Sequence, residues 1–179
     1  MIHRGRSRNV PAMNTQIHFD IGSSTLGQVL VALNDKGICA ILLGDSPATV
    51  KRELRQRFPA AQPVEDAGRL ARVLKQVIAF ADGRSATLDL PLDPAGTQFQ
   101  QHVWRALRGI PIGKTASYAD IARRIDAPKS FRAVAQACGA NPLALAIPCH
   151  RVVRNDGALS GYRWGVARKR ALLEREAAR

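Results

Sequence analysis

A cysteine and a histidine stand side by side in the segment NPLALAIPCHRVV, directly after a proline. Cys149 is a candidate nucleophile, but a free thiol with a pKa of about 8.5 is mostly protonated at neutral pH and needs a base or a cationic environment. His150, Arg151 and Arg154 could supply both. Adjacent side chains of an extended segment point to opposite sides, so a bridging water or a sharp turn must connect His150 to the sulfur. The alternative is that Cys149 is a small buried hydrophobic residue.

The last predicted helix, GVARKRALLEREAAR, carries a candidate partner for this histidine. Glu176 follows Leu172 by four residues and therefore shares the buried face of the helix. If it pairs with the His150 ring, the three groups form a set of nucleophile, base and orienting carboxylate, and the pKa of the thiol should lie below that of a free cysteine. The alternative is an ion pair with Arg170 or Lys169 at a frayed helix end.

Two short helices joined by a turn precede the cysteine. Ser117 can cap a helix over 118–125, and Ser130 can cap a second over 131–139, which is a helix-turn-helix pattern. On the second helix we expect the inward residues to be Phe131, Val134, Ala135 and Cys138, and the outward ones to be Arg132, Ala133, Gln136, Ala137 and Ala140. One long cation among small residues suits a DNA groove, although alanine's helix propensity also produces such patterns by chance.

Charge indicates the kind of partner. The chain has 179 residues, with 27 Lys and Arg against 14 Asp and Glu, and a formal net charge of +13. Residues 93–179 hold 15 basic residues against 6 acidic ones, whereas residues 14–92 hold 9 against 8. This net positive charge exceeds what solubility needs. We therefore expect the C-terminal half to bind a polyanion, and nucleic acid is the first candidate.

Composition excludes several classes of protein. With 46% hydrophobic and 23% charged residues, the chain is of the ordinary globular kind. No segment approaches the roughly 18 apolar residues of a membrane span. Cys39, Cys138 and Cys149 are an odd set without C-x-x-C spacing, which argues against a disulfide framework or a four-cysteine zinc site and favours a reducing, cytoplasmic compartment.

The N-terminal half reads as an α/β scaffold. The runs QIHFDI, LGQVLVAL and GICAILLG predict a three-stranded meander. Pro47 after Ser46 predicts the start of a helix, and a second helix over 66–81 gathers its apolar residues on one face: Leu70, Val73, Leu74, Val77 and Ile78.

A linker divides the chain. The stretch LPLDPAG, residues 90–96, contains two prolines and a glycine. Thr97 and Gln100 then predict a capping box for a helix with an apolar stripe of Phe99, Val103 and Leu107. We therefore expect a flexible leader over 1–13, an α/β domain over 14–92 and a helix-turn-helix domain over 93–179.

The segments IPCHRV, SGYRWG and LLEREA, with an Asn-Pro upstream, resemble the O6-alkylguanine-DNA alkyltransferases, or methylated-DNA–protein-cysteine methyltransferases. The likeness runs from about Phe99 to Glu176 and is closest to the C-terminal alkyltransferase part of the bacterial adaptive-response proteins. The N-terminal half resembles the family only in its order of strands and helices. The resemblance implies an α/β fold, with a ribonuclease-H-like α/β domain followed by a mainly helical, winged-helix-like domain.

The resemblance also implies a reaction, in which Cys149 takes an alkyl group from O6 of a flipped guanine, or from O4 of thymine, in a single turnover. Cys149 would be activated through a water to His150 and on to Glu176. Asn141 would hold the cysteine turn, and Tyr118 would rotate the phosphate and donate toward the base. The implied DNA-binding residues are Arg132, which would fill the vacated stack, with Ala133, Gln136, Tyr118 and Arg151; the implied pocket residues are Val152, Tyr162, Arg163 and Cys138.

Such a transfer implies no cofactor and no metal, alkylated double-stranded DNA as the partner, no membrane and a monomer. The cysteine-rich zinc part of the adaptive-response proteins is not expected here, because Cys39 alone precedes the linker and its ICAILL context is that of a core strand. One rival is a non-catalytic lesion sensor, which would lack the nucleophile. A second is a cysteine hydrolase using Cys149 and His150, which would not explain the excess of basic residues over 93–179.

Overall fold

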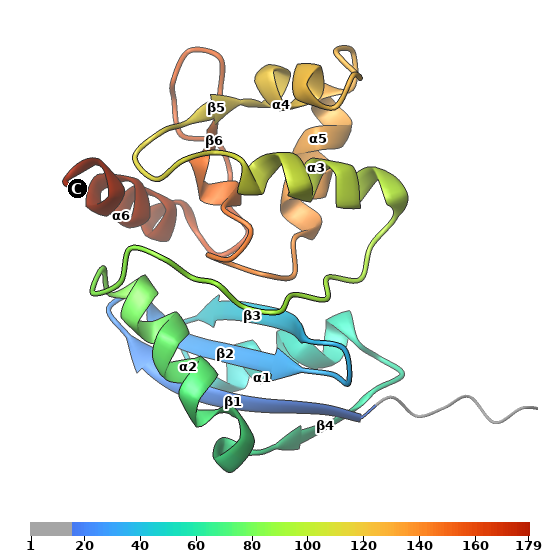
Figure 1. The fold of residues 1–179 in the computed structure, drawn as a ribbon, viewed down its shortest axis with the longest axis vertical. Helices are drawn as coiled ribbons and strands as arrows, with labels where there is room; N and C mark the ends of the chain where they lie inside the picture. Colours follow the sequence, from blue (N-terminus) through green and yellow to red (C-terminus); the bar gives the residue numbers. More distant parts are fainter. Residues whose placement is uncertain (1–15) are drawn as a thin grey trace, which may run out of the picture.

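The computed structural model describes residues 16–179, and the leader predicted over residues 1–13 lies outside that range. Figure 1 shows a sheet with one helix, Ala67–Ala81, in front of its strands and a mainly helical part above it, with the linker running between the sheet and that part. This is the mixed α/β arrangement that the sequence predicts.

The sheet contains four strands in the order β3-β2-β1-β4: β1 (Gln16–Ser24), β2 (Gly27–Leu33), β3 (Ile38–Gly44) and β4 (Gln62–Glu65). The first three form the predicted antiparallel meander. The fourth pairs in parallel with β1 and was not predicted. Its four residues, QPVE, are mostly exposed and include Pro63, which an edge strand tolerates, so no alternation of polar and apolar residues marks it.

Two helices pack on this sheet, α1 (Pro47–Arg57) against β2 and β3, and α2 (Ala67–Ala81) against β1 and β2. The predicted start of α1 is confirmed, since the Ser46 side chain accepts a hydrogen bond from the Thr49 backbone and Pro47 opens the first turn. The predicted face of α2 is buried at Leu70, Leu74 and Val77 and half-buried at its other two positions.

The linker has no regular structure but it is not detached from the sheet. The Ile38 backbone N–H donates to Pro91 O at 2.7 Å, and Asp93 N–H donates to Ile38 O at 2.8 Å. Further along, Ile41 exchanges backbone bonds with the segment before the cysteine, donating to Pro142 O and accepting from Ala144 N–H, both at 2.9 Å. Strand β3 therefore carries the C-terminal half on its open edge.

The C-terminal half contains α3 (Gln98–Arg108), β5 (Ala116–Ser117), α4 (Tyr118–Arg124), α5 (Phe131–Ala140), a 3-10 turn η1 (Cys149–Arg151), β6 (Val152–Val153) and α6 (Val166–Ala177). Helices α3, α4 and α5 pack against one another, and β5 pairs in parallel with β6. The predicted capping box of Thr97 and Gln100 is confirmed, and Ser117 forms a second one with Asp120. Ser130 stands at the N-cap of α5 but its side chain makes no capping bond, so that prediction is wrong.

The predicted faces of α5 need correction. Val134 and Cys138 are buried as expected, but Phe131 is 45% exposed, Ala135 is exposed, and Ala137, predicted outward, is 2% exposed. The cause is Trp104 of α3, whose indole N–H donates to Ala137 O at 2.9 Å. The buried stripe therefore turns toward α3.

Within residues 16–179, no helix has the length and apolar character needed to cross a bilayer. The same part of the chain contains no group of three His, Cys, Asp or Glu side chains placed to hold a metal ion.

Candidate active site

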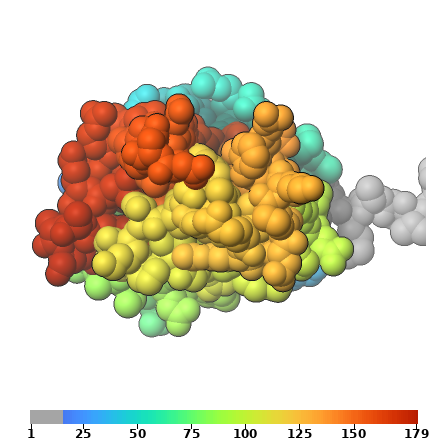
Figure 2. Space-filling model, turned by 90° about the horizontal axis from the view of Figure 1, so that it is seen from above, coloured from blue at the N-terminus to red at the C-terminus, as the bar shows by residue number. Residues whose placement is uncertain are grey.

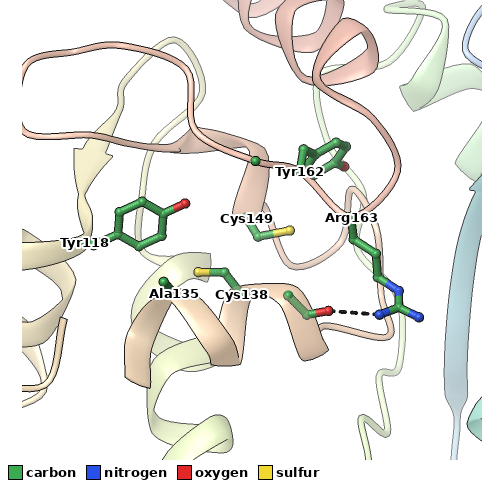
Figure 3. A pocket seen from close by; sticks show the side chains of 8 residues that line it. Tyr118, Ala135, Cys138, Cys149, Tyr162 and Arg163 are labelled. Carbon is green, nitrogen blue, oxygen red and sulfur yellow. Dashed lines mark hydrogen bonds between the residues drawn. The ribbon is translucent and has the colours of Figure 1, made fainter. Parts of the chain in front are cut away.

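A pocket of about 300 Å³ lies between α5 and the chain on either side of β6. It is lined by Tyr118, Ala135, Cys138, Gly139, Cys149, Gly161, Tyr162 and Arg163. Figure 3 shows Tyr118 on one side, Tyr162 and Arg163 on the other, and the two cysteines between them. Val152, predicted to line the pocket, is fully buried outside this lining, and its carbonyl accepts a bond from the Lys169 ammonium at 2.5 Å.

Cys149 lies on a tight turn rather than on the extended segment that the sequence suggested. Arg151 N–H donates to Pro148 O at 3.0 Å, which closes the 3-10 turn η1, and Cys149 N–H donates to Ile147 O at 2.8 Å just before it. The sharp turn was one of the two ways in which His150 could approach the sulfur. Cys149 is only 5% exposed, and the exposed part faces the pocket.

Asn141 holds this turn with its side chain. Its amide N–H group donates to Ile147 O at 2.9 Å and to Cys149 Sγ at 3.2 Å, while its carbonyl oxygen accepts from Leu143 N–H at 2.8 Å. The residue is completely buried, so these bonds are made without competition from water. This geometry fits the holding role that the resemblance implies.

Glu176 pairs with His150 and not with Arg170 or Lys169. His150 Nε2 lies 2.8 Å from Glu176 Oε1, and both groups are buried. Since Nε2 is engaged, Nδ1 is the ring nitrogen left for proton exchange, and it has no hydrogen-bond partner within residues 16–179.

Arg151 also binds Glu176, which corrects its predicted role in DNA binding. Its Nε donates to Oε2 and its Nη2 to Oε1, both at 2.9 Å, and its Nη1 donates to Ile110 O at 2.6 Å. The residue is 6% exposed. A guanidinium satisfied on three sides in the interior is not available to a phosphate, so Arg151 supports the Glu176 carboxylate instead.

The acid–base properties of the site follow from burial and these bonds. Burial would raise the pKa of Glu176, but the hydrogen bonds from His150 and Arg151 outweigh it and lower the pKa to about 2. Burial lowers the pKa of His150, against the opposing effect of Glu176. Burial raises the pKa of Cys149 to about 11, although the Asn141 hydrogen bond and the Lys169 charge act to lower it. The prediction of a thiol pKa below that of a free cysteine is therefore wrong for the unbound protein.

Lys169 is a site residue that the sequence suggested only as an alternative partner for Glu176. It is completely buried, and besides Val152 O its ammonium group donates to Ser160 Oγ at 3.0 Å. Ser160 in turn lies 2.6 Å from the Tyr118 hydroxyl, so the lysine connects α6 to the pocket wall. Its spacing of three and seven residues from Leu172 and Glu176 could have shown that it shares their buried face.

The predicted DNA-binding residues of α5 are not among the residues that line the pocket. Arg132 and Gln136 are exposed and Ala133 is half-buried. The Arg132 guanidinium lies over the Phe131 ring, 5.6 Å from its centre. Figure 2 shows α4, α5 and the loop after β6 sharing one exposed face of the molecule.

Comparisons with known proteins point to one family. Residues 17–94 match the family model described as 6-O-methylguanine DNA methyltransferase, ribonuclease-like domain, and residues 98–178 match the DNA binding domain of the same methyltransferase. The bifunctional transcriptional activator/DNA repair enzyme Ada of Escherichia coli is 54% identical over 164 residues, which cover 92% of this chain and 46% of Ada. This chain therefore spans about half the length of that relative.

Two further matches extend over nearly whole proteins. The inducible methylated-DNA–protein-cysteine methyltransferase of Bacillus subtilis is 39% identical over 159 residues, covering 89% of this chain and 84% of the relative. The crystal structure of Mycobacterium tuberculosis OGT in complex with DNA superposes with a TM-score of 0.77 at 36% identity, covering 90% of this chain and 93% of the other. With both family models matched in order and the cysteine, histidine and glutamate gathered in one site, the chain belongs to the 6-O-methylguanine DNA methyltransferase family.

Proposed function

We propose that this protein repairs alkylated DNA by moving the alkyl group from O6 of a guanine to the sulfur of Cys149, once per molecule. The observation that carries the proposal is the surroundings of that sulfur. It borders a pocket, accepts a bond from Asn141, and is followed in the chain by the His150–Glu176 pair. The names of the relatives above, which include DNA repair and methylated DNA, support the same reaction for this chain.

The reaction requires the guanine to leave the base stack. A sulfur must approach the alkyl carbon in line with the departing oxygen, which a stacked duplex prevents. The pocket beside α5 receives the flipped base, and Tyr118 and Tyr162 supply aromatic walls for it. Arg132, exposed on α5, fills the gap left in the stack.

The proton and electron balance then follows. The buried thiol, with its raised pKa, gives up its proton toward His150 as the base binds, and Glu176 stabilises the imidazolium that forms. The sulfur–carbon bond forms, the carbon–O6 bond breaks, and the electron pair leaves with the guanine. Tyr118 donates a proton toward the leaving base and regains one through solvent as the His150 imidazolium releases the thiol proton, so that unmodified guanine is released and a thioether remains on Cys149.

A titration of lesion against protein tests this proposal. Because a thioether is a poor leaving group, one molecule of protein should remove at most one O6-methylguanine from duplex DNA. The measurement is the residual lesion after completion at several protein-to-lesion ratios. Lesion removal in large excess over protein, without added thiol, would contradict the proposal and point to the hydrolase alternative.

Replacing Arg132 with alanine should slow repair of duplex DNA about tenfold or more, because a flipped base loses the side chain that occupies its place in the stack. Transfer from free O6-methylguanine base should be nearly unchanged, since no duplex has to open. Single-turnover rates on the two substrates give the comparison. Equal losses on both would remove the proposed role of Arg132.

Binding to undamaged duplex DNA should be strongly salt-dependent and weakly sequence-specific. If the exposed face shared by α4, α5 and the loop after β6 neutralises about four phosphates, affinity should fall roughly 100-fold between about 50 mM and 200 mM salt, because condensed counterions are released on binding. The small residues of α5 offer few groups for reading base edges. Fluorescence anisotropy at several salt concentrations measures both properties, and a salt-insensitive, sequence-specific complex would contradict this account.

Four narrower points are also proposed. O4-alkylthymine is the second lesion we expect. The three free thiols and the DNA substrate favour the cytoplasm as the compartment. A monomer is the working form we expect. We assign residues 14–92 to the scaffold domain and 93–179 to the domain that binds DNA and accepts the alkyl group.

A further inference from the structure

Arg57, in the last turn of α1, reaches from the N-terminal half into the C-terminal half. Its Nη1 donates to Ala140 O at 3.1 Å and its Nη2 donates to Asn141 O at 2.9 Å, while its Nε donates to Glu53 Oε1 at 3.1 Å. The side chain is only 13% exposed. Each nitrogen of the guanidinium therefore has an assigned acceptor, two of them at the end of α5.

The end of α5 needs such a group. The last carbonyls of a helix have no partners within it and form its negative pole, where a cation stabilises it. The last turn of α5 contains no basic residue, and its C-cap Asn141 makes only one helical backbone bond, from its N–H to Cys138 O. Arg57, more than 80 positions earlier in the chain, supplies a cation to the last of these carbonyls, Ala140 O, and to the carbonyl of the C-cap Asn141.

The two carbonyls bound by Arg57 directly precede the chain that holds the nucleophile. The Asn141 side chain donates to Cys149 Sγ, and the next residues of the same loop pair with Ile41 of β3. The base of the cysteine turn is thus fixed to the N-terminal half at two places, by Arg57 and by a strand edge. A shift of the Asn141 backbone would move the hydrogen-bond donor away from the sulfur.

Arg57 also affects the sulfur through its charge. Burial has the largest effect on the pKa of Cys149 and raises it. The Asn141 hydrogen bond and the Lys169 charge lower it, and the Arg57 charge lowers it further. Burial and the nearby Arg163 lower the pKa of Arg57, but a guanidinium remains charged at neutral pH. The other titratable or charged groups around the thiol are His150, Lys169, Cys138, Tyr118, Tyr162 and Arg163.

Glu53 extends the connection to the rim of the pocket. The same oxygen that accepts from Arg57 accepts from Arg163 Nε at 2.8 Å. Arg163 lines the pocket and also donates to Gly139 O at 3.3 Å, the bond drawn in Figure 3. One carboxylate on α1 therefore holds two arginines, one under the cysteine turn and one at the pocket rim.

We propose that Arg57, anchored by Glu53, is a positioning residue for alkyl transfer, through which the N-terminal half holds the Cys149 turn in its reactive arrangement. This inference rests on the proposed function, because the reaction it serves is methyl transfer from DNA. It assigns to the N-terminal half a part in the chemistry beyond that of a scaffold.

The test compares Arg57→Ala with Arg57→Lys and with Arg55→Ala in the full chain. Arg55 is an exposed arginine in the same turn of α1, so it controls for the loss of one charge from this helix. Two rates are measured between about pH 7 and pH 11, a range that approaches the raised pKa of the thiol: single-turnover methyl transfer from an O6-methylguanine duplex, and alkylation of Cys149 by iodoacetamide, followed by the mass of its peptide. The second rate reports the thiolate without DNA.

Arg57→Ala should shift both pH profiles to higher pH and slow transfer about tenfold at neutral pH, since each unit of rise in a thiol pKa lowers the thiolate fraction tenfold. Arg57→Lys keeps the charge but not the two-pronged contact, so it should keep the pH profile and lose about threefold in rate. Arg55→Ala should match the parent. A merely structural role would lower the amount of folded protein without shifting either profile.

Parent-like profiles for Arg57→Ala would overturn the inference. If that variant does not fold, as judged by circular dichroism, Arg57→Gln takes its place, with the same shift expected and an unshifted profile equally decisive against it. Failure of the parent to accept a methyl group would instead contradict the proposed function, and the iodoacetamide profiles would still decide whether Arg57 acts on the thiol.

Discussion

Replacing Cys149 with serine will abolish alkyl transfer and leave affinity for duplex DNA within about twofold of the parent. The sulfur supplies the nucleophile, and a serine hydroxyl of nearly the same size is far less nucleophilic in this buried place. The expected phosphate contacts lie on other residues, so binding has no reason to weaken. Methyl acceptance is measured with a labelled O6-methylguanine duplex, and affinity with the same duplex by anisotropy.

Cys138→Ser is the matched control for this change. Cys138 lines the same pocket and is also buried, and burial raises the pKa of its thiol well above the usual value. It accepts no hydrogen bond from Asn141, which binds the sulfur of Cys149. Transfer in Cys138→Ser should stay within a few fold of the parent. If the Cys149→Ser variant retains methyl acceptance and the control loses it, the nucleophile has been assigned to the wrong cysteine.

Replacing Glu176 with glutamine should slow transfer at neutral pH by about 100-fold, the usual contribution of acid–base assistance. The glutamine cannot stabilise the His150 imidazolium that accompanies a thiolate. Part of the lost transfer rate should be recovered as the pH rises, because the thiolate of Cys149 then forms without help from His150. Single-turnover rates across the alkaline range measure this recovery.

The same substitution should lower the free energy of unfolding by roughly 3 kcal/mol, because it leaves the Arg151 guanidinium buried without a counter-charge. The pH dependence has a definite sign. The pKa of Glu176 is lowered from 4.5 to about 2, so its carboxylate stabilises the folded state above about pH 4.5, and this contribution disappears as the pH falls toward 2. Urea unfolding of the parent should show the free energy of unfolding decreasing over this acid range, and Glu176→Gln should show a smaller decrease.

Glu174→Gln is the control for both measurements. Glu174 lies on the same helix but is exposed. Its substitution should change neither the rate nor the stability appreciably, since exposed charges contribute little. A Glu176→Gln variant that behaves like Glu174→Gln would show that no relay through His150 operates.

Local patterns in the sequence were sufficient for the elements whose signals lie within a few residues. The Ser46-Pro47 start, the capping box at Thr97, the helix cap at Ser117 and the apolar face of α2 each depend on spacing along one helix, and each is confirmed. The contact between Glu176 and His150 could also be anticipated, because a carboxylate on an apolar helix face must find a buried partner.

The features that the sequence did not predict correctly depend on contacts between segments far apart in the chain. Ala137 is buried because Trp104 bonds to its carbonyl, and alanine shows no preference for either side of a helix. Arg151 is a surface residue by type, and only the fold brings it to Glu176. Arg57 looks like an ordinary helix-end cation, and nothing local indicates that it serves another helix.

The most direct test of the central claim is the mass of the protein after incubation with excess duplex DNA carrying one O6-methylguanine. The account predicts a gain of one methylene group per protein molecule, placed by peptide fragmentation on the sulfur of Cys149, with no second addition at Cys138 or Cys39. The released DNA should contain an unmodified guanine at the lesion position. An unchanged protein mass together with lesion removal, or a methyl group found on any residue other than Cys149, would contradict it.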